Sequence, residues 1–230
     1  MPRRRETQDR LVTIIGLGRF GRSVARTLYE LGYEVTAIDR DERQVEEASD
    51  FVALATQGDG SDEGLLRSLH VERSAVAIVA QGSHLESSVL ATLVLKRLGV
   101  SCVVAKATNE LHGEVLRRVG ADRVIFPERD AGVRLAHTLD VPRVDDYISL
   151  SATSGIAKFA VPPNLIGRTL ADVHAASGAQ LSVLALKRGR LLTTTPSLDE
   201  CIQEGDDLVV IGSDTAIEAF VEAGLAESDA

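Results

Sequence analysis

The residues of this chain best suited to chemistry are three glycines and a carboxylate. Gly16, Gly18 and Gly21 form a G-x-G-x-x-G pattern, which Asp39 follows. Glycines at this spacing allow a tight turn, let the backbone approach a pyrophosphate and let a helix pack closely on a sheet, while the carboxylate binds ribose hydroxyls. Phosphates then meet the free N–H groups at the start of the helix. The pattern predicts a nucleotide site at which Asp39 disfavours the 2′-phosphate of NADP.

Two arginines leave the identity of that nucleotide open. Arg19 stands between the glycines, where the turn needs no charge, and a guanidinium there would form charge-assisted bonds with a terminal phosphate. ATP or ADP therefore competes with NAD(H) as the ligand; the alternative is that Arg19 is simply exposed to solvent. Arg40, next to Asp39, is a cation with which a 2′-phosphate would pair, so it weakens the exclusion of NADP.

Polar turns follow the next two expected strands. Gly58-Asp59-Gly60-Ser61 comes after the third strand and Gln81-Gly82 after the fourth. Ligands of open α/β sheets bind at the carboxyl ends of the strands, so both turns are candidates for the same site. The alternative is ordinary turn chemistry, in which Asp59 caps the helix that follows.

The elements that must position these residues alternate between short β-branched runs and amphipathic stretches, which is typical of parallel strands joined by crossover helices. The expected strands are Leu11–Ile15, Glu34–Asp39, Phe51–Ala55, Ala75–Ala80, Cys102–Ala105 and Val124–Ile125. The expected helices are Phe20–Leu31, Ser83–Leu98, Leu111–Val119 and a longer one near 130–139. The first part of the chain is therefore predicted to be an α/β domain with a Rossmann-type, doubly wound parallel sheet.

The pattern changes around Pro142, before which the longer helix ends. Short strands dominate from there on, at Tyr147–Leu150, Ile156–Val161, Gln180–Lys187, Leu191–Thr194 and Asp207–Ile211, with helices near Leu170–Ala176 and Asp214–Val221. We expect a flexible tail over residues 1–10, a nucleotide-binding domain over 11–142 and a smaller α+β domain over 143–224.

Composition and charge limit the classes of partner. The 230 residues carry a formal net charge of −9, with 44% hydrophobic and 26% charged residues, as is typical of a folded soluble protein. An acidic chain is a poor binder of nucleic acid or anionic lipid, and Arg3-Arg4-Arg5 is interpreted as a solvated tail. Cys102 and Cys201 are isolated, and no apolar run is long enough to cross a membrane. We expect a cytoplasmic protein that reaches the membrane only through a partner.

Residues for catalysis are scarce beside the nucleotide pattern. Hydride transfer needs an acid-base side chain, such as His, Lys or Tyr, close to the nicotinamide. The second domain holds His174 alone among histidines, and the Tyr-x-x-x-Lys pattern of short-chain reductases does not occur. The other histidines lack the spacing of a metal site or a triad: His70, His84, His112 and His137. We therefore expect a nucleotide sensor and not an enzyme.

Further motifs continue along both halves of the chain. The first half carries Ile15-Gly16-Leu17-Gly18-Arg19-Phe20-Gly21, Ala37-Ile38-Asp39, Gly58-Asp59-Gly60, Lys106-Ala107, Gly120-Ala121-Asp122-Arg123-Val124-Ile125 and Pro127-Glu128-Arg129-Asp130. The second half carries Pro163-Asn164-Leu165-Ile166-Gly167-Arg168-Thr169-Leu170 and Gly205-Asp206-Asp207-Leu208-Val209-Val210-Ile211-Gly212. In this order the motifs resemble the RCK family, which regulates the conductance of potassium, and within it the KtrA and TrkA subunits of potassium uptake systems. The second half is similar to their TrkA-C, or RCK-C, domain.

The resemblance implies homodimers that assemble into an octameric ring on the cytosolic face of a membrane potassium channel subunit of the KtrB or TrkH type. ATP and ADP favour different ring shapes in that family. The position matching Arg19 contacts the ATP phosphates there, and the position matching Asp39 holds the ribose. The remaining pocket positions match Asp59, Gly60, Gln81, Gly82 and Lys106, with Phe20 and Arg40 expected at the same site.

Two further ligands are implied by the resemblance alone. Glu128 corresponds to a carboxylate that helps bind a cation, Ca²⁺, Mg²⁺ or Na⁺, at the dimer interface of KtrA proteins; a glutamate favoured by a helix N-terminus is the alternative. The RCK-C domain of some relatives binds cyclic di-AMP, and Asn164–Leu170 lies in the corresponding region. The alternatives to an ATP- and ADP-gated subunit are a TrkA-like subunit that senses NAD(H) and a soluble NAD-dependent oxidoreductase.

Overall fold

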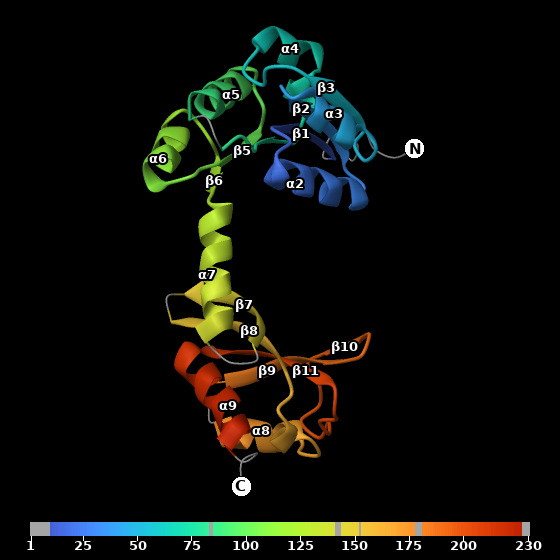
Figure 1. The fold of residues 1–230 in the computed structure, drawn as a ribbon, viewed down its shortest axis with the longest axis vertical. Coiled ribbons are helices and arrows are strands. Elements are labelled where there is room, and N and C mark those ends of the chain that lie inside the picture. The colour runs from blue at the N-terminus through green and yellow to red at the C-terminus, as the bar shows by residue number, and fades with distance from the viewer. Residues whose placement is uncertain (1–9, 83–84, 141–143, 152, 178–180, 227–230) are drawn as a thin grey trace. The chain divides into compact units, whose positions relative to one another are not determined.

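The computed structural model describes residues 10–82, 85–140, 144–151, 153–177 and 181–226 of the chain (Figure 1). The chain divides into two compact units, residues 1–128 and 129–230. The domain boundary expected at residue 142 and the basic segment Arg3–Arg5 lie outside the described residues. Each unit has a sheet and a hydrophobic core of its own.

The first unit contains a six-stranded parallel sheet in the order β3-β2-β1-β4-β5-β6. Its strands are β1 (Leu11–Ile15), β2 (Glu34–Asp39), β3 (Leu54–Gln57), β4 (Val76–Val79), β5 (Cys102–Lys106) and β6 (Arg123–Ile125). The order reverses between β1 and β4, which makes this the switch point where open α/β sheets bind ligands. The predicted Rossmann-type, doubly wound sheet is confirmed.

Helices cover both faces of this sheet (Figure 1). They are α2 (Arg19–Glu30), α3 (Glu42–Ser49), α4 (Glu63–Ser68), α5 (Leu85–Arg97) and α6 (Glu110–Arg118), with a 3-10 turn η1 (Val71–Arg73). Alternation along β1 sends Val12 and Ile14 to one face, into a core that α2 and α3 share. Ile15 points to the other face and shares a core with residues of α4, α5 and α6. β1 is packed on both faces, so the turn after it starts from a rigid strand.

Two features of the first unit differ from the expected elements. The third strand begins at Leu54, whereas Phe51 and Val52 are buried ahead of it. Their apolar character reflects this burial and not strand pairing, so the expectation that the strand starts at Phe51 is wrong. The expected helices did not include α3, and a helix at α4 was expected only as the one that Asp59 would cap, because both helices are short and carry few apolar residues.

In the second unit, five antiparallel strands form a sheet in the order β10-β9-β11-β8-β7. The elements are α7 (Pro127–Asp140), which leads in from the first unit, β7 (Val144–Ser151), β8 (Ser154–Ala160), η2 (Pro163–Leu165), α8 (Leu170–Ser177), β9 (Leu181–Arg188), β10 (Leu191–Thr194), β11 (Asp206–Ser213) and α9 (Asp214–Ala226). Val173 of α8 and Phe220 of α9 share one core cluster with Phe159 of β8. The predicted smaller α+β domain is confirmed.

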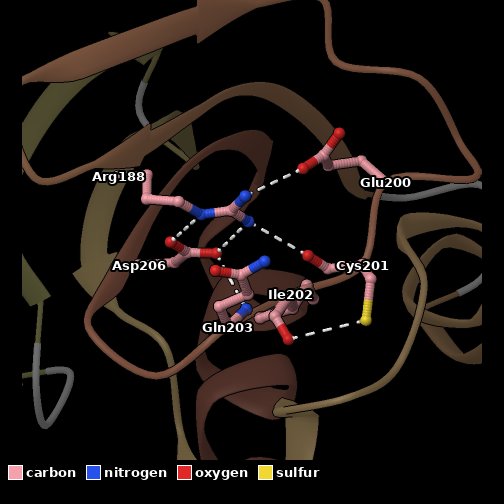
Figure 2. Close-up of polar contacts among 6 residues, drawn as sticks. All are labelled: Arg188, Glu200, Cys201, Ile202, Gln203 and Asp206. Carbon is pink, nitrogen blue, oxygen red and sulfur yellow. Dashed lines mark hydrogen bonds and ion pairs between the residues drawn. The ribbon is translucent and has the colours of Figure 1, made fainter.

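An ion pair between half-buried Arg188 and a buried carboxylate joins β9 to β11 in this unit (Figure 2). Asp206 is fully buried, and its two carboxylate oxygens accept hydrogen bonds from Nε and Nη2 of Arg188, each at 2.8 Å. The same guanidinium donates to Glu200 Oε1 at 3.2 Å and to the carbonyl oxygen of Cys201 at 3.0 Å. The hydrogen bonds from Arg188 lower the pKa of Asp206. Arg188 therefore ties two strands and the segment before β11 to one buried charge.

Candidate functional site

The glycine turn after β1 has the backbone geometry that phosphate binding needs. Gly16 has a φ of +97°, a left-handed conformation that favours glycine, and its N–H donates to the carbonyl oxygen of Ile38 at 2.8 Å. A Cβ on Gly21 would lie 1.9 Å from the carbonyl oxygen of Gly16, so α2 packs against the turn as closely as glycine allows. A Cβ on Gly18, which precedes α2, would meet nothing within 4 Å. This open space leaves room for a phosphate at the helix N-terminus.

The turn forms one wall of a cavity of about 430 Å³ at the carboxyl edge of the sheet, a size typical of small-molecule sites. Expected site residues that line it are Gly16, Gly18, Asp39, Arg40, Gln81 and Gly82. Residues that were not expected there are Asp41, Gln44, Ala80 and Ser87. The lining comes from the ends of β1, β2 and β4 and the first turns of α3 and α5, which meet where the strand order reverses.

Asp39 is held between two backbone segments at the end of β2. Its Oδ2 accepts a hydrogen bond from the N–H of Leu17 at 2.5 Å, and its Oδ1 accepts one from the N–H of Asp41 at 2.9 Å. These bonds fix the carboxylate beside the glycine turn. Each oxygen keeps a further lone pair for a ribose hydroxyl. The geometry thus supports the role predicted for Asp39.

Arg40 and Asp59 pair with each other beside the cavity. Arg40 Nη2 donates to Asp59 Oδ2 at 2.6 Å, and the N–H and hydroxyl of Ser61 donate to Asp59 Oδ1 at 2.9 and 2.7 Å. Burial raises the pKa of Asp59, but the bonds from Ser61 and Arg40 outweigh burial, so the pKa is lowered. The cap of α4 is Asp62, whose carboxylate accepts the N–H of Gly64 at 2.8 Å. The alternative in which Asp59 caps that helix is therefore wrong.

Gly60, in the same turn, is buried against β1. A Cβ at this position would lie 2.1 Å from Cγ2 of Ile15. The structure therefore gives this glycine a packing role, in which the turn after β3 approaches β1 closely.

A second group of expected residues gathers around Lys106, at the end of β5. Lys106 Nζ donates to Glu128 Oε1 at 2.5 Å and lies 5.6 Å from the centre of the Phe20 ring. The hydrogen bond from Lys106 lowers the pKa of the Glu128 carboxyl, and the charge of Arg19 adds to this effect. A Cβ on Gly82 would lie 3.2 Å from Lys106 Cε, so the lysine stem borders the wall of the cavity.

Arg19 lines a different hollow from Asp39. This hollow has a volume of about 520 Å³, and its other lining residues are Arg22, Ser23, Arg26, Glu47 and Asp50. Arg22 pairs with Glu47, and the guanidinium of Arg26 lies 4.2 Å from the centre of the Phe51 ring. A contact between Arg19 and a phosphate would therefore require a phosphate chain that extends past Gly18 and beyond the cavity that Asp39 lines.

Two amide side chains in the cavity wall fit a ligand that supplies hydrogen-bond donors. The Oε1 atoms of Gln44 and Gln81 are buried, and neither has a partner within the described part of the chain. Buried polar atoms are normally paired, so these oxygens suit donors such as an adenine amino group or a ribose hydroxyl. Gln44 was not expected because α3 was not. The signal that would have located it is Asp41, the cap of α3, whose Oδ1 accepts the N–H of Arg43 at 3.0 Å.

The described residues include no group of three or more His, Cys, Asp or Glu side chains that could hold a metal ion. Glu128 already has Lys106 as a partner, so one chain supplies a single carboxylate for the expected cation. That site would depend on a second copy of the chain and stays a prediction. No described helix combines the length and the apolar character that a membrane span requires.

Known proteins match both units of the chain. The TrkA-N domain family matches residues 12–127, and the TrkA-C domain family matches residues 156–223. The Ktr system potassium uptake protein C of Bacillus subtilis is 39% identical over 207 residues, which are 90% of this chain and 94% of the relative. The Ktr system potassium uptake protein A of the same organism is 33% identical over 218 residues, which are 95% of this chain and 98% of the relative.

The fold is also similar to that of a solved RCK domain. The GsuK RCK domain superposes with a TM-score of 0.64 at 20% identity, over 93% of this chain and 48% of the other chain. The two domain families follow each other here in the order TrkA-N, then TrkA-C, and the identity to the Ktr proteins extends through both. The chain therefore belongs to the family of Ktr-type potassium uptake proteins that combine a TrkA-N domain with a TrkA-C domain.

Proposed function

We propose that this chain is the regulatory subunit of a Ktr- or Trk-type potassium uptake system, in which a nucleotide bound by the first unit controls a membrane channel subunit. The observation that carries the proposal is the cavity at the switch point of the sheet, lined by the glycine turn, Asp39 and two amides whose oxygens have no partner among the described residues. The 39% identical relative is named a potassium uptake protein.

ATP and ADP are the preferred ligands within this proposal. Arg19 is the first residue of α2, and Lys106 Nζ lies 5.6 Å from the centre of the ring of Phe20 in the same helix. A phosphate chain that leaves the cavity there would meet both cations, of which Lys106 is shared with Glu128. A ligand shifts a two-state assembly only by its different affinity for the two states. ATP differs from ADP by the γ-phosphate, so the site must contact that group to distinguish the two. NAD(H) is the second candidate. Arg19 lines a different hollow from Asp39, and Arg40, the cation in the cavity lining, is already paired with Asp59. The cavity itself therefore holds little positive charge for a terminal phosphate.

The family further supports a proposal for assembly. The chain would form homodimers that assemble into an octameric ring on a channel subunit of the KtrB or TrkH type, at the inner face of the cell membrane. Two copies of Glu128, together with phosphate oxygens, would then offer Ca²⁺, Mg²⁺ or Na⁺ the oxygen ligands that one chain lacks. Binding of cyclic di-AMP near residues 164–170 rests on the family alone and stays a prediction.

Calorimetric titration with ATP, ADP and NADH tests the ligand. Wild type should bind ATP and ADP, and Arg19→Ala should weaken ATP binding by about tenfold relative to ADP, because a hydrogen bond to a charged group contributes about 1.5–3 kcal/mol. Arg118→Ala is the matched control: Arg118 is 77% exposed on α6 and pairs with Glu114. An unchanged ratio of ATP to ADP affinity in Arg19→Ala would remove Arg19 from this role. Tight binding of NADH alone would favour the second candidate.

Native mass spectrometry of the purified chain tests the assembly. An octamer that releases an adenine nucleotide on denaturation is the expected result. A monomer with no affinity for any of the three nucleotides would contradict the proposed function.

A further inference from the structure

His112, on α6, is a buried side chain that the expected nucleotide contacts do not use. The residue is 1% exposed, and its ring bridges two segments that flank the cavity. On one side it meets Ser88 in the first turn of α5, next to Ser87 in the cavity wall. On the other side it meets Thr108, two residues after Lys106.

The hydrogen bonds determine which ring nitrogen carries the proton. The N–H of Thr108 donates to His112 Nδ1 at 3.3 Å, so Nδ1 is an acceptor and the proton of the neutral ring lies on Nε2. Nε2 then donates to Ser88 Oγ at 2.8 Å, and the Ser88 hydroxyl donates to the carbonyl oxygen of Leu85 at 2.8 Å. The chain of bonds runs in one direction from the Lys106–Thr108 segment through the ring to the first turn of α5.

The same two segments meet at the cavity wall. A Cβ on Gly82 would lie 3.2 Å from Lys106 Cε and 3.5 Å from Thr108 Cγ2, so Gly82 has the Lys106–Thr108 segment as its immediate neighbour. The backbone of His112 is itself fixed, because its N–H donates to Oδ1 of Asn109, the cap of α6, at 2.9 Å. A displacement of Thr108 would therefore move Lys106 relative to Gly82 and Ser87.

We propose that His112 is a positioning residue of the nucleotide pocket, whose neutral ring ties the Lys106–Thr108 segment to the first turn of α5. It sets the distance between the Lys106 ammonium and the cavity without touching the ligand. This inference rests on the proposed nucleotide site and adds to it a residue that determines affinity.

Two substitutions of His112 separate positioning from packing. His112→Asn retains an acceptor near the place of Nδ1 for the N–H of Thr108, whereas His112→Leu fills the space without any hydrogen bond. We expect His112→Leu to weaken binding of ATP and ADP by about fivefold, the equivalent of one hydrogen bond, and His112→Asn to restore most of the affinity. Calorimetry on the full chain, with thermal denaturation of each variant, measures both effects.

The matched control is Ser74→Ala. This change removes a buried hydrogen bond of 2.8 Å between Ser74 Oγ and Thr13 Oγ1, in the same unit but outside the cavity lining. It should lower the melting temperature and leave nucleotide affinity unchanged. Ser88→Ala replaces His112→Leu if the latter does not fold, and it should weaken binding by about two- to fivefold.

Wild-type affinity in folded His112→Leu or its replacement would overturn this inference while leaving the proposed function intact. Equal weakening of binding by Ser74→Ala would also overturn it, because affinity would then follow stability alone. If the wild-type chain binds none of ATP, ADP and NADH, the proposed function fails and this inference fails with it.

Discussion

At the scale of single residues, His112 shows how burial sets the protonation state of an isolated histidine. Its ring contacts the uncharged groups of Ser88 and Thr108, and burial lowers its pKa below the ordinary value of 6.5. Between the folded-state pKa and 6.5, the unfolded chain binds more protons than the folded chain. The free energy of unfolding must therefore rise with pH in this window.

We expect the stability of the first unit to fall as the pH drops below about 6.5, and the fall to end below the folded-state pKa. His112→Asn cannot titrate, so its stability should depend less on pH over the same range. Urea denaturation at about pH 7.5 and about pH 5.5 measures the difference for both chains. If both chains lose the same free energy between these two conditions, His112 does not carry the dependence.

At the scale of the element, the contact between α2 and the glycine turn gives two glycines of one motif different roles. Gly21 has no space for a side chain, because a Cβ would lie 1.9 Å from a backbone oxygen of Gly16. Gly18 has an ordinary φ of −58° and open space around it. Gly21 is therefore needed for packing, whereas Gly18 is needed only if a ligand approaches.

This difference predicts opposite effects of two alanine substitutions. Gly21→Ala should destabilise the first unit by roughly 1–3 kcal/mol, as overpacking does. Gly18→Ala should leave stability within about 0.5 kcal/mol of wild type. It should nevertheless weaken ATP and ADP binding, because its Cβ would stand in the space left for a phosphate. Thermal denaturation and calorimetry on both variants measure the two effects; a destabilised Gly18→Ala with normal affinity is the result that does not fit.

At the scale of the whole molecule, two units with separate cores predict separable responses. Arg188→Ala leaves the buried carboxylate of Asp206 without its cation, which destabilises a fold strongly. We expect faster hydrogen exchange in β9, β11 and residues 200–203 of this variant, with β1 and β2 unaffected. Binding of ADP should slow exchange at the glycine turn of the first unit.

Exchange mass spectrometry resolves both responses by peptide. Glu200→Gln is the matched control, because it alters only the weaker bond, at 3.2 Å, to the same guanidinium. It should change exchange less than Arg188→Ala does. Faster exchange throughout both units of Arg188→Ala would show that the units do not respond separately.

The sequence by itself determined the fold class, the order of the strands along the chain and most residues of the cavity lining. β1, β2 and β10 match their expected bounds, because each lies within two residues of a glycine turn, at Gly16, Gly32 and Gly189. Gly16, Asp39 and Gln81 were predicted at one site because strand ends in an open parallel sheet meet at one edge. These inferences depend only on spacing and on the rules of one fold.

Only the tertiary structure decided how these residues divide between two places. Arg19 is adjacent to the glycines in the sequence, which predicted it at their site. Its side chain instead lines a different hollow from the cavity that Asp39 lines. Gln44 joined the cavity through a short helix without a strong apolar period. His112 acquired its partners from α5 and from the segment after β5, which are neighbours only once the sheet has formed. Side-chain direction and long-range contact are set by packing, which spacing along the chain does not encode.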